Sequence, residues 1–153
     1  MFEIREDDLS GEPTCELLRL HLAGMRADSP PGEVFALDLS GLQTPDITVW
    51  TVWYQDRIAA IGALKMLPDG TAEVKSMRTH SDFLRMGAGA AVLETIIAAA
   101  KAKGVHRLSL ETGSGTAFEP ALTLYRRRGF VNGEAFGGYE QSSFNQFLHL
   151  AMG

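Results

Sequence analysis

The residues with the clearest chemical potential are two glycines separated by one small residue, Gly87-Ala88-Gly89. They stand where the loop after a predicted strand enters a predicted helix, and small residues there let backbone N–H groups approach a bulky anion. The preceding residues, Leu84 to Met86, include no Ser, Thr, Asp or Asn that could cap the first N–H groups of the helix. The pattern therefore predicts a phosphate or pyrophosphate site, with water as the alternative partner.

Other interpretations of the same glycines stay open. Ala88 to Ala91 also suit close packing of a helix on a sheet, which needs no ligand. A dinucleotide fingerprint has Gly or Ala at its sixth position, where this chain has Val92, but Glu111 at the end of the next predicted strand keeps that function as an alternative. A Walker-type loop is excluded, because no Lys-Ser or Lys-Thr follows the glycines.

Length and composition favour a single domain over residues 1–153. The chain is 45% hydrophobic and 22% charged, which suits one core that needs no metal or disulfide to fold. Its one cysteine, Cys15, allows no internal disulfide and has no histidine at zinc-ligand spacing, so we expect no metal site and a cytoplasmic location. The net charge of -5 disfavours nucleic acid, and no apolar tract reaches the roughly 18 residues of a membrane span.

Hydrophobic periodicity predicts strands that alternate with helices. The predicted strands are Phe2 to Arg5, Ile47 to Tyr54, Ile58 to Leu67, Thr71 to Thr79, Val105 to Glu111 and Phe144 to Leu150. The predicted helices are Pro13 to Met25, a short one around Val34, Leu37 and Leu39, then Ala88 to Lys103 and Ala117 to Arg128. This order is typical of an α/β or α+β fold with one sheet. Phe144 to Leu150 is also a candidate for pairing between subunits in a homodimer.

The strand from Thr71 to Thr79 alternates polar and apolar residues. Successive side chains of a strand point to opposite faces of the sheet. The alternation predicts one face with Ala72, Val74, Ser76 and Arg78, and another with Glu73, Lys75, Met77 and Thr79.

Two motifs resemble signatures of the GNAT acetyltransferase superfamily. Arg85-Met86-Gly87-Ala88-Gly89-Ala90 is similar to its Gln/Arg-x-x-Gly-x-Gly/Ala signature, and Ala121-x-x-x-Tyr125-x-x-x-Gly129-Phe130 is similar to its later A-x-x-LY-x-x-x-GF segment. The two agree in order and spacing, and the resemblance covers essentially the whole chain. It implies a GNAT-like fold, in which about four helices flank a central mixed, mostly antiparallel sheet of six or seven strands.

The resemblance implies acetyl-CoA as the co-substrate. In this fold the strand Thr71 to Thr79 parts from Val105 to Glu111, often at a bulge, and the wedge admits the pantetheine arm. The Met77 N–H would then polarise the thioester carbonyl, and the glycine loop would hold the pyrophosphate. The residues that the resemblance assigns to acetyl-CoA are Met77, Arg78, Thr79, Leu84, Arg85, Met86, Gly87, Ala88, Gly89 and Ala90.

The resemblance also implies the catalytic groups. Tyr125 is expected beside the thioester sulfur as the general acid, although its ring also suits packing on the sheet. Glu73 is predicted to face the same side as Met77 and to take a proton from the amine through water, or else to be a surface or ion-paired residue. Glu111 is predicted to anchor the amine of the substrate, or else to cap the following loop.

Together these features predict an N-acetyltransferase that moves an acetyl group directly from acetyl-CoA to a small amine, without a metal. One alternative is a non-catalytic acyl-CoA sensor of the same fold, and another is a dinucleotide-binding protein. Nucleic acid and membrane partners are not expected.

Overall fold

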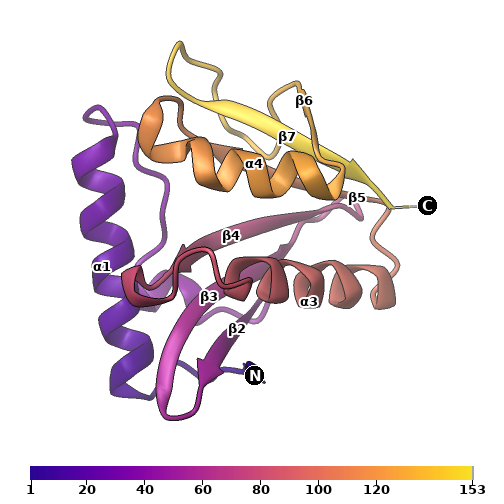
Figure 1. Cartoon of the computed structure of the whole chain (residues 1–153). Helices are drawn as coiled ribbons and strands as arrows, with labels where there is room; N and C mark the ends of the chain where they lie inside the picture. Colours follow the sequence, from indigo (N-terminus) through magenta and orange to yellow (C-terminus); the bar gives the residue numbers. More distant parts are fainter. Residues whose placement is uncertain (153) are drawn as a thin grey trace.

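A seven-stranded mixed sheet forms the centre of the molecule (Figure 1). The computed structural model describes residues 1–152, and its strands follow the order β1-β2-β3-β4-β5-β7-β6. The strands are β1 (Glu3–Glu6), β2 (Ile47–Tyr54), β3 (Arg57–Met66), β4 (Ala72–Thr79), β5 (Arg107–Thr112), β6 (Val131–Gly133) and β7 (Gln146–Ala151). Among the strands of residues 1–152, only β4 and β5 pair in parallel. The prediction of a mixed, mostly antiparallel sheet is confirmed.

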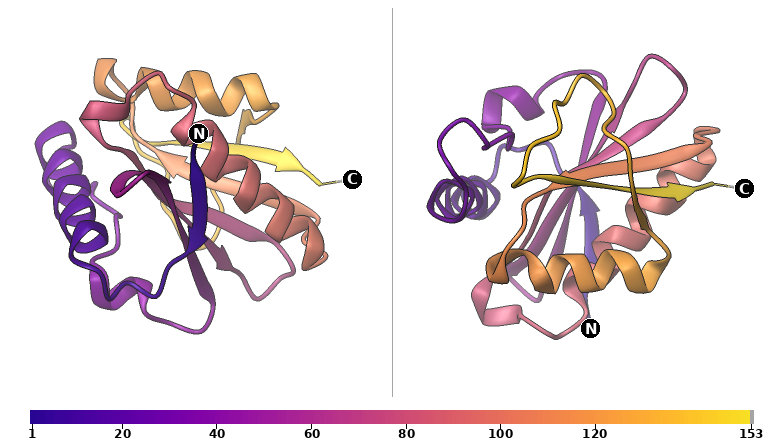
Figure 2. Two further views of the ribbon diagram at one scale, coloured as in Figure 1. Left: turned by 60° about the horizontal axis from the view of Figure 1, so that its bottom comes forward. Right: turned by 90° about the horizontal axis from the view of Figure 1, so that it is seen from above.

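Helices cover both faces of the sheet, with α1 and α3 on opposite sides (Figure 2). The helices are α1 (Glu12–Asp28), α2 (Leu39–Leu42), α3 (Ala88–Ala102) and α4 (Glu119–Arg128), and two 3-10 turns are η1 (Ser81–Phe83) and η2 (Thr116–Phe118). One cluster of buried side chains packs α1 and α2 against β2 and β3. A larger cluster packs α3 and α4 against the other face.

Proline and glycine mark several of the helix ends. Pro13 lies in the first turn of α1, where its missing N–H costs no hydrogen bond. Gly87 precedes α3 with a φ of 87°, and Gly129 ends α4 with a φ of 112°. Both angles lie in the region that residues with a Cβ rarely adopt, so glycine fits these two boundaries.

The parallel strands β4 and β5 separate soon after they meet. Their pairing covers only Ala72 with Leu108 and Glu73 with Ser109, although both strands continue beyond these residues. The divergence is visible between α3 and α4 in Figure 1. From Val74 onward, β4 therefore has a neighbouring strand on its β3 side alone, as the resemblance implied.

A β-bulge lies within β4. Ala63 pairs with Lys75 and Ile61 pairs with Arg78, so two residues of β4, Ser76 and Met77, lie opposite Gly62 alone. Ser76 has a φ of 57°. An extra residue of this kind reverses the face to which the following side chains point.

The alternation predicted for β4 is therefore wrong beyond the bulge. Met77 lies on the α3 face, because its Sδ would come within 2.7 Å of a Cβ at Gly62, beside side chains of α3. Glu73 lies on the opposite face, together with the side chain of Arg78, which contacts α1. Glu73 and Met77 thus do not share a face.

Two further predictions about local structure need correction. The short helix α2 begins at Leu39, and Val34 and Leu37 precede it in irregular chain. The last strand, β7, is paired on both sides, with β5 and with β6, and its Phe147 and Leu148 are buried. It is not an exposed edge, because the short strand β6, which the sequence did not locate, covers its second side.

Candidate functional site

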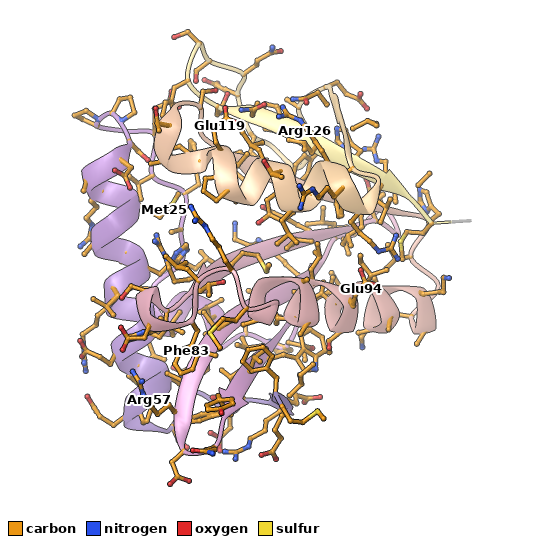
Figure 3. The ribbon with its side chains drawn as sticks, viewed as in Figure 1. Met25, Arg57, Phe83, Glu94, Glu119 and Arg126 are labelled. Carbon is orange, nitrogen blue, oxygen red and sulfur yellow. The ribbon has the colours of Figure 1, made fainter. Side chains whose placement is uncertain are left out.

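A cavity of about 770 Å³ fills the space between the diverging strands. It is bounded by α1, β4, β5, the loop before α3, and α4. Met25 on α1 and Phe83 on η1 both line it and are labelled in Figure 3. The predicted site residues that line it are Glu73, Met77, Arg78, Thr79, Leu84, Arg85, Gly87, Ala88, Gly89, Ala90, Glu111 and Tyr125. Met86 does not line it, and is 53% exposed.

The start of α3 presents uncapped N–H groups to this cavity. Gly87, the residue before the helix, makes no side-chain cap, and Arg85, two residues before Gly87, also has a positive φ, of 62°. At Gly89, a Cβ would come within 3.2 Å of Thr79 Oγ1, so glycine allows α3 to approach the end of β4. The first turn of a helix carries partial positive charge, which suits an anion.

The bulge leaves polar groups of β4 available. Ser76 Oγ is buried and has no hydrogen-bond partner among residues 1–152. A bulge also takes one residue out of the ladder with the neighbouring strand. Since β5 has already parted from this stretch, the main chain from Ser76 to Thr79 borders the cavity as an open strand edge.

Tyr125 projects from α4 toward the same space. It is 5% exposed and its ring packs against Phe130, with 5.8 Å between ring centroids. Burial raises the pKa of its phenol above the usual value, so the hydroxyl keeps its proton at neutral pH. The packing interpretation and the acid interpretation of this residue are therefore compatible.

Glu73 belongs to a cluster of three polar side chains, in which those of Glu73 and Lys75 are buried and that of Tyr139 is partly buried. Its Oε2 accepts a hydrogen bond from the Tyr139 hydroxyl at 2.5 Å and pairs with Lys75 Nζ at 3.1 Å. Lys75 also donates to the Tyr139 hydroxyl at 2.8 Å. The ion-paired interpretation of Glu73 thus describes its contacts, and one of its oxygens is committed to two partners.

Sequence reasoning missed Tyr139 and the role of Lys75. Tyr139 lies in the irregular segment between β6 and β7, just after Gly137-Gly138, where no periodicity signals burial. Its ring contacts Phe35, from the segment between α1 and α2, and Phe147. In the sequence, the only indication of a special role for Tyr139 is its position directly after two glycines.

Glu111 stands on β5 beside this cluster without joining it. Among residues 1–152 its carboxylate forms no ion pair. Burial raises its pKa to about 7, Lys75 opposes that shift, and the charges of Glu73 and Glu33 add to it. It is a cavity-lining carboxyl group that exchanges its proton near neutral pH.

Residues 13–130 match the model of the Acetyltransferase (GNAT) family. The chain is 40% identical over 152 residues to the uncharacterized N-acetyltransferase YedL of Escherichia coli (strain K12), covering 99% of this chain and 96% of that protein. This chain belongs to the GNAT acetyltransferase family. The family resemblance predicted from the two motifs is confirmed.

Solved structures agree with the fold of a GNAT protein. A structure described as an acyl-CoA N-acyltransferase from Klebsiella pneumoniae superposes with a TM-score of 0.84 at 22% identity, covering 99% of this chain and 98% of that one. An acetyltransferase of Bacillus subtilis in complex with CoA gives 0.72 at 18% identity, with 99% of each chain covered. At these identities the likeness concerns the fold alone.

Residues 1–152 contain no candidate for two other kinds of site, a metal centre and a membrane span. No group of three or more His, Cys, Asp or Glu side chains within that range is arranged to hold a metal ion. No helix within it is both long and apolar enough to cross a membrane.

The buried cluster predicts a distinct stability response. Lys75→Met should lower the free energy of unfolding at pH 7 by about 3–5 kcal/mol, because it leaves the buried charge of Glu73 without its cation. The double variant Glu73→Gln/Lys75→Met should recover part of that loss. Denaturant unfolding followed by circular dichroism measures both.

The matched control is Arg19→Met, since Arg19 pairs with Glu12 and Glu16 at the surface and is 60% exposed. Its effect should stay within about 1 kcal/mol. Equal losses for Lys75→Met and Arg19→Met would show that the cluster does not behave as a buried ion pair.

Proposed function

We propose that this protein is an N-acetyltransferase that moves an acetyl group from acetyl-CoA directly to a small amine. The observation that carries the proposal is the combination of an uncapped helix start and an open strand edge on one cavity. Such a surface offers main-chain donors to a diphosphate and to an amide-containing arm. Family membership supports the same activity.

The residues present fit acetyl-CoA as the acyl donor. N–H groups from Arg85 to Ala90 would hold the diphosphate, and the main chains of Met77 and Thr79 would pair with the pantetheine arm. The orphaned Ser76 Oγ offers a further polar partner beside them. When bound, acetyl-CoA supplies the acetyl group as an activated thioester.

The donor and the acceptor enter from opposite faces of β4 in this proposal. Met77 and Thr79 turn toward α3, while Glu73 and Lys75 lie on the α1 face. The Met77 N–H would stabilise negative charge that develops on the thioester oxygen. The acceptor amine then approaches from the side where Glu111 lies.

Tyr125 serves as the general acid in this scheme. It gives its proton to the departing thiolate. Burial raises the pKa of the Tyr125 phenol and so keeps the proton in place until the thiolate forms, and burial of the thiolate raises the pKa of the thiol in the same direction, which offsets the weaker acidity of the phenol. Its position on α4 beside the cavity supports this role.

Glu111 is the better candidate for the general base, in place of the prediction that assigned this step to Glu73. Glu73 already pairs with Lys75 and Tyr139. Glu111 lines the cavity, and its raised pKa of about 7 lets it take a proton from the substrate amine near neutral pH. The base role of Glu73 stays a prediction.

Partners beyond the two substrates, a homodimer and a cytoplasmic location stay predictions of the sequence. A homodimer would need a surface other than β7, since that strand is paired on both sides. Sedimentation of the purified chain decides the oligomeric state.

Replacing Gly87 tests the diphosphate site. Gly87→Ala forces a Cβ into a φ of 87°, so the loop should shift, and its affinity for CoA should fall about tenfold, which corresponds to roughly 1.4 kcal/mol. Calorimetry with CoA measures the change.

Gly104→Ala is the matched control, because Gly104 has a φ of 75° at the other end of α3 and, like Gly87, no atom within 4 Å of an added Cβ. It should cost similar stability and leave CoA affinity intact. A loss of CoA affinity shared by both variants would count against the proposed site.

Replacing Tyr125 tests the acid. Tyr125→Phe should lower kcat by roughly 100-fold while CoA affinity stays the same, since the ring packing is kept and only the proton donor is lost. Release of free thiol from acetyl-CoA over a panel of amines measures turnover. Tyr54→Phe, at an exposed ring on β2, is the control.

Thiol release with wild-type protein also decides between enzyme and sensor. If CoA binds and no amine consumes acetyl-CoA, the protein is a binding module. If Tyr125→Phe keeps full turnover, the acid assignment is wrong.

Replacing Glu111 tests both its role as the base and its raised pKa, because each predicts a pH dependence, one of activity and one of stability. In wild-type protein kcat/KM should rise through about pH 7 as Glu111 loses its proton, and Glu111→Gln should remove that limb and lower the rate. The pKa is raised from 4.5 in the folded state, so folding favours the protonated form and stability falls as pH rises between 4.5 and about 7.

Glu111→Gln should therefore raise Tm at pH 8 and leave it nearly unchanged near pH 4, where wild-type Glu111 is also neutral. Scanning calorimetry at both values measures this. A variant that is less stable at pH 8 would contradict the assigned environment of Glu111.

A further inference from the structure

The side chain of Arg78 points toward α1, away from the open edge of β4 that is proposed to bind acetyl-CoA. Its Nε donates to His21 Nδ1 at 3.1 Å, and its Nη2 donates to the His21 carbonyl oxygen at 3.3 Å. Burial, and then the nearby positive charges, lower the pKa of His21 to about 4. His21 is therefore neutral at physiological pH, and its Nδ1 accepts the hydrogen bond that orients the guanidinium.

The guanidinium keeps donors that the protein does not use. Of five N–H groups on an arginine, the two contacts to His21 occupy one on Nε and one on Nη2. Among residues 1–152 no carboxylate forms an ion pair with Arg78; Asp28 acts on it only at longer range. Since Arg78 lines the cavity, its remaining donors are available to a ligand there.

Gly24 makes room for this arrangement. A Cβ at Gly24 would lie 2.7 Å from Nη2 of Arg78 and 3.2 Å from its Cζ. Glycine inside a helix is less stable than alanine, so α1 gives up helix stability where the guanidinium packs against it.

The pairing of β4 with β5 gives the position of Glu111 along the strand direction. Glu73 pairs with Ser109. Glu111 is two residues beyond Ser109, and Lys75 is two residues beyond Glu73. Because the strands are parallel, Glu111 and Lys75 lie at nearly the same position along the strand direction, on the same face of the sheet. The electrostatic effect of Lys75 on Glu111 agrees with this placement.

Arg78 lies a short distance further along the same face. On β3 its partner is Ile61, whereas the partner of Lys75 is Ala63, two residues away. Two residues of an antiparallel strand span about 7 Å. Arg78 and Glu111 both line the cavity, and a separation of this size along the strand is within the length of one small molecule.

We propose that Arg78 binds a carboxylate of the acceptor, and that the acceptor is a small molecule with both an amine and a carboxylate, such as an amino acid. The guanidinium presents paired N–H donors, which match the two oxygens of a carboxylate. This inference rests on the proposed acetyl transfer, and it adds the chemical class of the acceptor.

The carboxylate takes no part in bond making. In the transfer the carbon–sulfur bond of the thioester breaks and a carbon–nitrogen bond to the amine forms. The ammonium group of the acceptor first loses one proton to solvent, which leaves a neutral amine. The proton that the amine loses on attack goes to Glu111, and the thiolate receives one from Tyr125. Proton exchange with solvent then restores both side chains. Arg78 holds the acceptor, so it is a binding residue whose loss should raise KM more than it lowers kcat.

Matched acceptors test the inference. Thiol release from acetyl-CoA is measured with ω-amino acids of two to six carbons and with n-alkylamines of the same lengths. Wild-type protein should prefer an amino acid over its matched alkylamine. Arg78→Gln should lower that preference by about 10- to 100-fold, as expected for lost hydrogen bonds to a charged group, mainly through KM.

Gly24→Ala is the second variant, and it keeps the arginine. It strengthens the helix but displaces the guanidinium, so the preference for the amino acid should also fall while Tm does not. Arg19→Gln, at an exposed arginine on the same helix, is the control and should keep the preference.

The outcomes separate the two proposals. If no amine of either series causes thiol release from acetyl-CoA, the proposed function is wrong, and this inference, which rests on it, is wrong as well. If amines are acetylated but Arg78→Gln and Gly24→Ala leave the preference unchanged, or slow both series equally, Arg78 only joins β4 to α1 and the inference is overturned. If Arg78→Gln does not fold, Gly24→Ala decides.

Discussion

One extra residue in β4 determines how this molecule can work. Opposite Gly62 the strand places both Ser76 and Met77, and the side chains that follow exchange faces. Without the bulge, Arg78 would point toward α3 and Met77 toward α1, and the cavity would have no guanidinium on the side of Glu111. Gly62 is part of the same constraint, because a Cβ there would collide with Met77, Ile96 and Val92.

The cavity consequently has two chemically different halves. Toward α3 it is bordered by main chain and small residues, which provide uncharged donors and an open path. Toward α1 it contains charged side chains, with the Glu73–Lys75 pair neutralised internally and Glu111 and Arg78 left unpaired among residues 1–152. The first half suits a long ligand whose own amide groups and diphosphate accept hydrogen bonds from the main chain of the protein. The second half suits a small zwitterion, since Arg78 offers it a cationic group and Glu111 a carboxyl group.

The sequence predicted the features that follow from local patterns. Ile47 to Tyr54, rich in β-branched and aromatic residues, is a strand with those bounds, and the glycine loop does stand before an uncapped helix. The bulge could not be predicted from alternation, because Ser76 continues the polar–apolar pattern and the positive φ falls on a serine rather than on a glycine. Tyr139 and the unused donors of Arg78 depend on contacts between residues more than 50 positions apart in the chain, which periodicity does not report.

The central claim is that the open edge of β4 and the start of α3 bind the acyl donor. Amide NMR on isotope-labelled protein tests this claim most directly. Titration with CoA should shift the resonances of Met77, Thr79 and Gly87 to Ala90 most strongly, with smaller changes on α1. If those amides stay unperturbed while CoA binds, or if the largest shifts fall on the segment from Gly137 to Ser142, the wedge between β4 and β5 is not where the donor is held.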